Sequence, residues 1–380
     1  MSSYFSFQKL DQSNPDLLII DTNGLKYLKK CLPKELTYSS VNIRSKIPYV
    51  FSLSFFLRLI LNFIKYKFKP ISLIYSIVET LKPNAIISFL DNSKLIGQLS
   101  LKFPELLVMS IQNGVRTLPD DFVSKKGKFN LPIYFSFGEY EKDLIAYLNV
   151  PCIEVNEVGS LKLSLFLEKS FNKINDNSIC FISQYRSVLT TSKDKIARDC
   201  ISRLEEIYKN LLICSNSKKI NVAMRSNRMD SDYKSERTFF LNLSKNSRLI
   251  ENDRNNFSSY KLAFSSTVIV AMDSTLAFEM FGSGKRVLFC DFAKNQKYMN
   301  RKGVEFLYSK LPKELVLESF DIDEMQSKIN LLVSMSETSY RRLTKISRNY
   351  YLKKTNIPTN EIISNYLKKN ITRHPKKYVQ

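Results

Sequence analysis

The stretch from Ser266 to Phe292, STVIVAMDSTLAFEMFGSGKRVLFCDF, constrains the fold of this chain more than any other part of its sequence. Residues 267–271 have the length and β-branched content of an inner strand of a parallel sheet. Residues 285–289 begin a second apolar strand, and Gly282 and Gly284 before it are typical of a helix end. Strand, helix and strand in immediate succession predict an open α/β sheet in this half of the chain.

The predicted helix of this block begins with Asp273, Ser274 and Thr275, side chains that favour a helix N-terminus. At the carboxyl end of a parallel strand, free N–H groups and the helix dipole bind anions, so we expect a phosphate or diphosphate here. Glu279 lies one turn beyond Thr275 and would accept hydrogen bonds from ribose hydroxyls. The alternative is an ordinary helix cap followed by a solvated glutamate.

The rest of the chain alternates strands with helices in the same way. Strands are predicted at 16–21, 85–90, 106–111, 133–137, 152–159, 178–183 and 219–224, and helices at 25–32, 71–81, 193–212, 233–243, 321–334, 340–350 and 359–369. We therefore expect an α/β protein with two Rossmann-like domains facing a cleft. The polar segment 171–177 suggests a first domain at 1–165, a second at 178–340, and a basic helical tail at 341–380.

Polar side chains follow three successive strands of the predicted first domain. Because such strand ends line one crevice, these side chains are expected to converge. They are Asp91, Asn92, Gln112, Asn113, Arg116 and Glu139. In the second domain Arg186 and Arg225 follow the first two strands, where they would neutralise phosphate; structural salt bridges are the alternative for each.

Five short motifs in a fixed order span nearly the whole chain. They are FLDNS at 89–93, SIQNGVR at 110–116, SQYR at 183–186, AMR at 223–225 and DSTLAFE at 273–279. This order resembles that of GT-B glycosyltransferases, and more narrowly of bacterial surface-carbohydrate proteins related to glycerophosphotransferases and Kdo transferases that make capsules and O-antigens. The resemblance implies a GT-B-like fold that binds a nucleotide-sugar donor in the second domain and a polysaccharide or lipid-linked acceptor in the first.

The general base must be chosen from few residues. The only histidine is His374, so a histidine base or a histidine-rich metal site is not expected. Carboxylates remain, and in an inverting transferase one of them deprotonates the acceptor hydroxyl. Asp91 is the first choice, because the resembling family keeps an acid-containing turn there, and Glu139 is the second. The alternative for Asp91 is an Asx-turn or helix cap.

No metal or other cofactor is expected, because the resemblance implies a transferase whose cations and helix dipole replace a metal. Asp230 and Asp232 have DxD spacing, but they lie in a polar loop where helix capping is the favoured use. A glycerophosphate or polyol-phosphate transferase is an alternative. It is disfavoured because Asn113 stands where those relatives carry a His-Gly pair, and an amide cannot act as a base.

The net charge of +22 arises from 58 basic and 36 acidic residues. It indicates either an anionic partner or a basic surface that is simply solvated. Residues 341–380 alone carry eleven lysines and arginines and one acid. An anionic membrane surface fits this pattern; nucleic acid is the weaker alternative, because no helix-turn-helix, zinc-finger or RNP pattern is present. A non-catalytic membrane-surface or nucleic-acid-binding protein of the same fold therefore stays open.

Residues 49–68 form the most apolar segment, which is interrupted by Arg58 and Asn62 and ends in lysines. It falls short of a membrane span and predicts either a core helix packed on the first sheet or an interfacial helix at a bilayer surface. The start of the chain lacks a signal-peptide pattern, and the six cysteines are scattered without a CxxC pair. We therefore expect a cytoplasmic protein, with a peripheral position at the inner face of the plasma membrane as a possibility.

Overall fold

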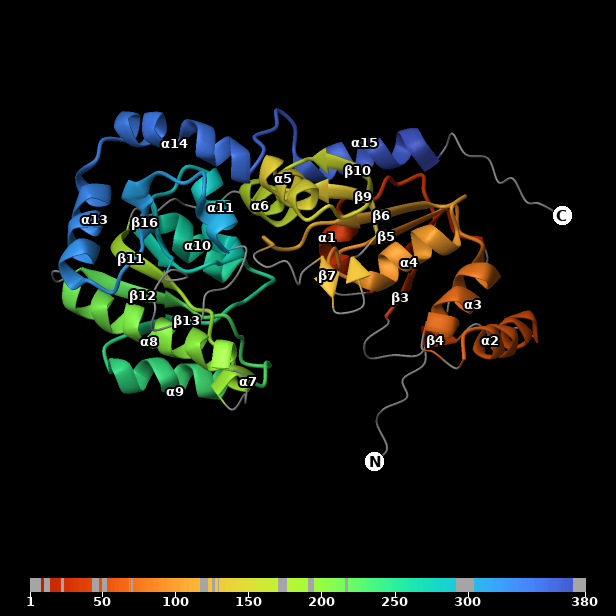
Figure 1. The fold of residues 1–380 in the computed structure, drawn as a ribbon, viewed down its shortest axis with the longest axis horizontal. Helices are drawn as coiled ribbons and strands as arrows, with labels where there is room; N and C mark the ends of the chain where they lie inside the picture. Colours follow the sequence, from red (N-terminus) through yellow and green to blue (C-terminus); the bar gives the residue numbers. More distant parts are fainter. Residues whose placement is uncertain are drawn as a thin grey trace.

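The computed structural model contains two parallel six-stranded sheets, each flanked by helices (Figure 1). It describes residues 8–9, 14–21, 24–42, 48–49, 53–67, 69, 71–116, 122–124, 127–128, 130–169, 176–190, 195–215, 218–291 and 304–371. The predicted α/β architecture with two Rossmann-like sheets is confirmed. The sheets lie side by side along the long axis of the molecule.

The first sheet has the strand order β10-β9-β6-β5-β2-β3, with every neighbouring pair parallel. Its strands are β2 (Leu17–Ile20), β3 (Tyr38–Val41), β5 (Ala85–Ser88), β6 (Leu107–Ile111), β9 (Leu131–Ser136) and β10 (Cys152–Glu157). Its helices are α1 (Leu25–Leu28), α3 (Ile71–Leu81), α4 (Lys94–Lys102) and α5 (Glu139–Tyr147). The central strands are buried on both faces, which explains their continuous apolar runs.

The second sheet has the order β13-β12-β11-β14-β15-β16 and is also parallel throughout. Its strands are β11 (Asp176–Ile182), β12 (Lys219–Ala223), β13 (Arg248–Ile250), β14 (Ser266–Ala271), β15 (Val287–Cys290) and β16 (Val316–Leu317). Its helices are α7 (Ser187–Thr190), α8 (Lys195–Cys214), α9 (Tyr233–Leu243), α10 (Ser258–Ser265), α11 (Thr275–Gly282), α12 (Val304–Tyr308) and α13 (Ile322–Ser334), with a 3-10 turn at Lys313–Leu315. The predicted succession of inner strand, helix and strand is confirmed in β14, α11 and β15.

Two pairs of short strands complete the described elements: β1 (Gln8–Lys9) with β4 (Pro48–Tyr49), and β7 (Val123–Ser124) with β8 (Gly127–Lys128). The sequence did not predict β3, β13 or β16, or the helices α5, α6 (Leu161–Leu167), α7, α10 and α12. These elements are short, and none of them is set off by a clear apolar period.

The last helices divide between the two halves of the molecule. Helix α14 (Glu337–Tyr351) covers the second domain, whereas α15 (Thr359–Ile371) returns to the first sheet (Figure 1). There the ring of Tyr366 meets Phe135 edge-on at 5.1 Å, and its hydroxyl donates to Glu154 at 2.9 Å. The segment predicted as a basic tail from 341 is thus partly packed helix, and residues 372–380, with His374, lie outside the described residues.

Helix α2 (Leu53–Lys65) forms within the apolar segment 49–68. It packs against α3 at the outer end of the first domain (Figure 1), and its Phe55 is buried in an apolar cluster with Leu18 and Val41 of the first sheet. Packing on the first domain is therefore confirmed for Phe55, whereas most other large apolar side chains of the helix are exposed, and the interfacial helix stays a prediction. None of the helices in the described part of the chain has both the length and the apolarity that crossing a bilayer requires.

Candidate functional site

A cavity of about 440 Å³ lies between the two domains. From the first half of the chain it is lined by Gly24, Tyr27, Phe89, Asn113 and Lys162, and from the second half mainly by Arg225, Asn252, Arg254, Tyr260, Ser274, Thr275 and Glu279. Most of these residues follow the carboxyl ends of strands or begin helices, the place where open α/β sheets bind ligands. The cavity therefore joins strand ends of both domains, and of the polar side chains predicted in the first domain, Asn113 is the one among its lining residues.

The start of helix α11 forms part of the cavity wall. Ser274 is the N-cap residue in extended conformation, and its side chain makes no cap hydrogen bond. Thr275 instead reaches the first domain, where its Oγ1 accepts a hydrogen bond from the Val115 N–H at 3.0 Å. Since the first turn of a helix leaves its N–H groups without intrahelical partners, this end of α11 offers donors to an anion.

Asp273, which was also predicted at this helix start, points to another strand end. Its carboxylate accepts a hydrogen bond from Gln184 Nε2 at 2.8 Å, and it is not part of the cavity wall. The contact joins the turns that follow β11 and β14. Asp273 therefore holds the loop in front of α11, and Ser274 and Thr275 are the residues that face the cavity.

Glu279 lies one turn into α11, lines the cavity and is almost completely buried. Ser160, the N-cap of α6, donates to Oε1, and Tyr260 donates to Oε2 at 2.6 Å. Burial raises the pKa of Glu279, while the nearby charge of Lys162 opposes that rise. A carboxylate has about four acceptor positions, so these two donors leave capacity for ligand hydroxyls.

Several cations surround the same space. Arg225 lines the cavity and pairs with Asp232 at 3.3 Å, while Arg254 lies on the same wall. Burial lowers the pKa of Arg225, and the neighbouring charge of Arg186 lowers it further. Arg186 itself is exposed and is not part of the cavity wall. Of the two predicted arginines, the structure thus brings one to the cavity and leaves the other beside it.

Lys162 belongs to α6 and was not predicted as a site residue. Its Nζ donates to the Asn113 carbonyl at 3.2 Å and lies 5.3 Å from the centre of the Phe89 ring. Burial lowers the pKa of Lys162, and the Glu279 carboxylate raises it. The lysine therefore sits between the acceptor-side turn and the helix that carries Glu279.

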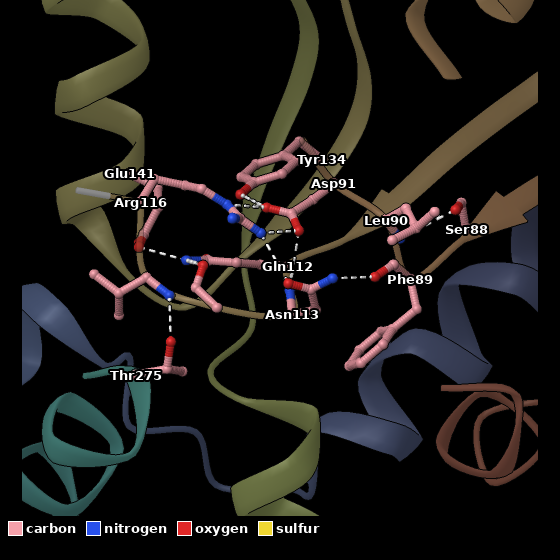
Figure 2. Close-up of polar contacts among 12 residues, drawn as sticks. Ser88, Phe89, Leu90, Asp91, Gln112, Asn113, Arg116, Tyr134, Glu141 and Thr275 are labelled. Atoms are coloured by element: carbon pink, nitrogen blue, oxygen red, sulfur yellow. Dashed lines mark hydrogen bonds and ion pairs between the residues drawn. The ribbon is translucent and has the colours of Figure 1, made fainter. Parts of the chain in front are cut away.

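Four of the six polar side chains predicted to converge in the first domain lie close together (Figure 2): Asp91, Gln112, Asn113 and Arg116. Asp91 is 1% exposed, and its carboxylate accepts two hydrogen bonds from Arg116. One comes from Nε at 2.7 Å, and the other from a terminal nitrogen of the guanidinium. The Tyr134 hydroxyl (2.9 Å) and the Asn113 N–H (3.2 Å) also donate to it. Since both carboxylate oxygens are occupied, this geometry makes Asp91 a positioning group; its role as general base stays a prediction.

Gln112 links this cluster to Glu141, an acid that the sequence analysis did not single out. Gln112 Nε2 donates to Glu141 (Figure 2) and to the Gly114 carbonyl at 3.0 Å. Its Oε1 accepts a hydrogen bond from the Phe137 N–H. Glu141 is fully buried, and this burial raises its pKa to about 8, although the Gln112 hydrogen bond opposes the rise. Burial therefore favours the protonated form of Glu141 in the folded protein.

Two of the predicted acceptor-side residues do not join the cluster. Asn92 and Glu139 are exposed, and neither is part of the cavity wall. Asp232, from the DxD-like loop, pairs with Arg225 and accepts from the Ser187 hydroxyl. Within the described ranges, no group of three or more His, Cys, Asp or Glu residues has a geometry that could hold a metal ion.

The residues missed by the sequence analysis share one property: their contacts join distant parts of the chain. Ser160 donates a hydrogen bond to Glu279, and Lys162 donates one to the Asn113 carbonyl. The Nζ of Lys26 donates to the Arg254 carbonyl at 2.8 Å. The Gly159-Ser160 pair marks a helix start, but nothing in the sequence indicates what its side chains face.

Residues 109–371 match a family model described as "putative O-antigen biosynthesis protein". The match covers more than half of the chain. The chain belongs to this O-antigen biosynthesis family. The matched segment contains the Gln112–Arg116 turn, helix α6 and the whole second sheet, whereas Asp91 and helix α2 lie before it.

Solved structures similar to this O-antigen family member agree on the fold. The UDP-GlcNAc 2-epimerase of Methanocaldococcus jannaschii, in complex with UDP-GlcNAc and UDP, aligns with a TM-score of 0.54 and 12% identity over 96% of this chain and all of its own. The wall teichoic acid polymerase TagF (H548A) gives 0.54 and 14% over 95% and 90%. MnaA of S. aureus, with UDP, gives 0.54 and 16% over 97% and 99%. At these identities the likeness establishes the GT-B-like fold alone.

No curated protein matches the sequence.

Proposed function

We propose that this O-antigen family protein is a metal-independent glycosyltransferase that takes a sugar from a nucleotide-activated donor. The donor nucleotide would occupy the cavity between the domains, with its phosphate at the start of α11. The observation that carries the proposal is the presence of a helix N-terminus, a buried carboxylate and several cations in one cavity wall. Two of the similar proteins are recorded with UDP, which agrees with a nucleotide in this fold.

The proposed contacts to the donor follow from the charges and hydrogen-bonding groups of the cavity wall. Ser274 and the free N–H groups of α11 would bind phosphate oxygens, and Arg225, Arg254 and Lys162 would neutralise the charge that develops on the leaving phosphate. Glu279 would accept from the ribose hydroxyls, because Ser160 and Tyr260 already fix its orientation. Arg186 would add positive potential from outside the cavity wall. Asp273 would act through Gln184 by holding the loop.

On the acceptor side, Asn113 lines the cavity and is fixed by three groups around it. Its Nδ2 donates to the Phe89 carbonyl at 2.6 Å, its Oδ1 accepts from Arg116 at 2.9 Å, and its N–H donates to Asp91. This rigid amide supports a sugar-transfer reaction over glycerophosphate transfer, whose relatives are expected to use a histidine base there. Asp91 would become a base only if Arg116 left it, and Glu139 only if α5 turned toward the cavity.

We propose a cell-surface polysaccharide or a lipid-linked precursor as the acceptor, reached from the cytoplasm at the inner face of the plasma membrane. Family membership supports the link to surface carbohydrate. The excess of 22 positive charges supports attraction to an anionic membrane surface rather than to an acidic substrate alone. Helix α15, with Lys368 and Lys369 in its last turn, and the exposed helix α2 both lie on the first domain, which would hold the acceptor (Figure 1).

A thermal-shift screen tests the donor site. The purified protein is melted with CMP, UMP, UDP, GDP, ADP and dTDP, since a ligand that binds only the folded state raises its stability, by about 2.7 kcal/mol at 100 times Kd. We expect one nucleotide to raise Tm. The Glu279→Gln variant should bind it about tenfold or more weakly, because a charged acceptor for ribose is lost.

Glu337→Gln is the control for that variant. Its carboxylate pairs with Arg341 at 2.9 Å on α14 and lies outside the cavity wall, so the nucleotide shift should equal that of the wild type. A screen in which no nucleotide raises Tm would sink the proposal. Equal shifts in the wild type and in Glu279→Gln would remove Glu279 from the donor site.

A further inference from the structure

Helix α2 exposes its apolar side to solvent. Six large side chains, each between 46% and 78% exposed, form a continuous stripe along the helix: Leu53, Phe56, Leu57, Ile60, Leu61 and Ile64. Their spacing follows the 3.6-residue turn of an α-helix, so they belong to one face. A surface helix of a globular protein normally turns such an apolar face toward the core of the protein. This stripe is therefore an unpartnered surface within the described residues.

The opposite face of α2 packs on the first domain: Phe55 is buried in its apolar core, and polar contacts to α3 fix the orientation of the helix. Asn62 is buried, and its Nδ2 donates to Ser76 Oγ at 3.0 Å and to Glu79 Oε2 at 2.9 Å. Ser72 donates to the Asn62 carbonyl at 3.2 Å. Rolling the stripe inward would break these buried hydrogen bonds, each of which is costly to leave unmade. The outward orientation is thus built into the packing.

The charges beside the stripe are of one sign. Residues 53–69 contain Arg58, Lys65, Lys67 and Lys69 and no acid. Arg58 and Lys65 are seven residues apart and so lie on one flank of the stripe, and Lys67 and Lys69 are exposed just beyond the end of the helix. An apolar face bordered by cations is the pattern of a helix that lies in an anionic bilayer interface.

We propose that α2 docks this protein onto an anionic lipid bilayer, with its apolar stripe among the acyl chains and its cations at the headgroups. At 13 residues the helix is roughly 20 Å long, too short for a hydrocarbon core of about 30 Å, so it lies in the surface and does not span it. A second copy of the chain fits less well, because a symmetric contact through α2 would bring like charges together with no acid to meet them.

The inference goes beyond the proposed glycosyltransferase activity and does not depend on donor binding. Its consequence for that activity is geometric: the first domain, which carries the acceptor side of the cavity, would be held at the membrane. The cavity lies between this domain and the second one, away from α2 (Figure 1). Loss of membrane docking should therefore leave the response to nucleotides intact.

Vesicle flotation tests the proposal with three proteins. The apolar variant carries Leu57→Gln, Leu61→Gln and Ile64→Gln, and glutamine keeps the helix propensity and the net charge. The control carries Val188→Gln, Ile213→Gln and Met229→Gln, which replace apolar residues of the second domain that are 64% to 92% exposed. The vesicles contain phosphatidylcholine with about 30% phosphatidylglycerol, or phosphatidylcholine alone, at about 0.1 M and about 0.5 M salt.

We expect the wild type and the control to bind the anionic vesicles, with weaker binding at high salt and to phosphatidylcholine alone. The apolar variant should bind at least about tenfold more weakly, with an unchanged circular dichroism spectrum and melting temperature. Equal binding by the apolar variant and the wild type, or no binding by the wild type, overturns the proposal. A wild type that is dimeric without vesicles and an apolar variant that is monomeric would assign the stripe to self-association and would also overturn it.

The nucleotide thermal shift, measured without vesicles on the same three proteins, separates this proposal from the proposed function. If the proposed function fails, no protein shifts, whatever the flotation result. If the docking proposal fails, flotation is unchanged by the α2 substitutions, whatever the nucleotide result.

Discussion

At the scale of single residues, the acceptor side of the cavity depends on a buried ion pair. Asp91 and Arg116 are both more than nine-tenths buried, and Tyr134 and Asn113 supply the remaining hydrogen bonds of the carboxylate. Removal of one partner from such a pair leaves an uncompensated charge. The pair therefore holds the Gln112–Arg116 turn against the end of β5. Because Asn113 belongs to this turn, the same ion pair fixes the position of Asn113 in the cavity wall.

Glu141 makes a prediction about pH. Its folded-state pKa of about 8 lies above the ordinary value of 4.5, so between these values the folded state binds more protons than the unfolded one. The free energy of unfolding should then fall as pH rises through this window, by up to about 1.4 kcal/mol per pH unit from this residue. Glu141→Gln keeps an acceptor for Gln112 and removes the titration, so its stability should fall less steeply with pH.

Urea unfolding at several pH values between 5 and 8 measures both slopes. Glu139→Gln is the matched control, because Glu139 is an exposed residue at the start of the same helix and should leave the slope unchanged. Parallel curves for the wild type and Glu141→Gln would show that Glu141 does not titrate in this window.

The sequence identified the residue types of the site better than their contacts. Ser274, Thr275, Glu279 and Arg225 were predicted at the donor side because caps and strand ends are local features, and all four line the cavity. That they bind a donor stays a prediction. Glu141 was not singled out because no helix was predicted at 139–147, and only the packing of α5 shows that this acid is buried.

At the scale of elements, the β14–α11–β15 block formed where it was predicted, because each boundary carries its own local signal. The β-branched run fixes the strand, Ser274 begins the helix, and Gly284, with φ at +94°, ends it. Helix α10 was missed for the opposite reason: it leads directly into β14 with no glycine or proline between them. Strand β3 was missed because two serines interrupt its apolar pattern.

Gly97 of α4 lies against the backbone that leads into β9. A Cβ added there would lie 1.9 Å from the carbonyl oxygen of Asn130, which leads into β9. Alanine in a helix is usually more stable than glycine by about 1 kcal/mol, but overpacking costs about 1–3 kcal/mol. Gly97→Ala should therefore lower the free energy of unfolding by about 2 kcal/mol.

Gln98→Ala is the control on the same helix, because Gln98 is exposed and its substitution by alanine should leave stability unchanged or raise it slightly. Denaturant unfolding of both variants checks the prediction. A Gly97→Ala protein as stable as the wild type would mean that α4 can move away from β9 at no cost.

At the scale of the whole molecule, the cleft is bridged by contacts that no local pattern predicts. The Val115 N–H meets Thr275 across 160 residues of sequence, and Ser160 meets Glu279 across 119. Lys26 donates to the Arg254 carbonyl and to Asn255 Oδ1 at 3.0 Å. The sequence predicted two domains facing a cleft from the alternation of strands and helices. It could not pair the cleft walls, because these pairings depend on how the two sheets are placed against each other.

The proposed function places a donor nucleotide between the domains, against Arg225. The most direct test is calorimetric titration of the nucleotide that raises Tm, with wild type, Arg225→Ala and Arg228→Ala. Both arginines are exposed and carry one acidic partner, Asp232 and Glu251 respectively, but only Arg225 lines the cavity. We expect Arg225→Ala to bind about tenfold or more weakly, since a charge-assisted contact is lost, and Arg228→Ala to match the wild type. Equal affinity in all three proteins would contradict the account.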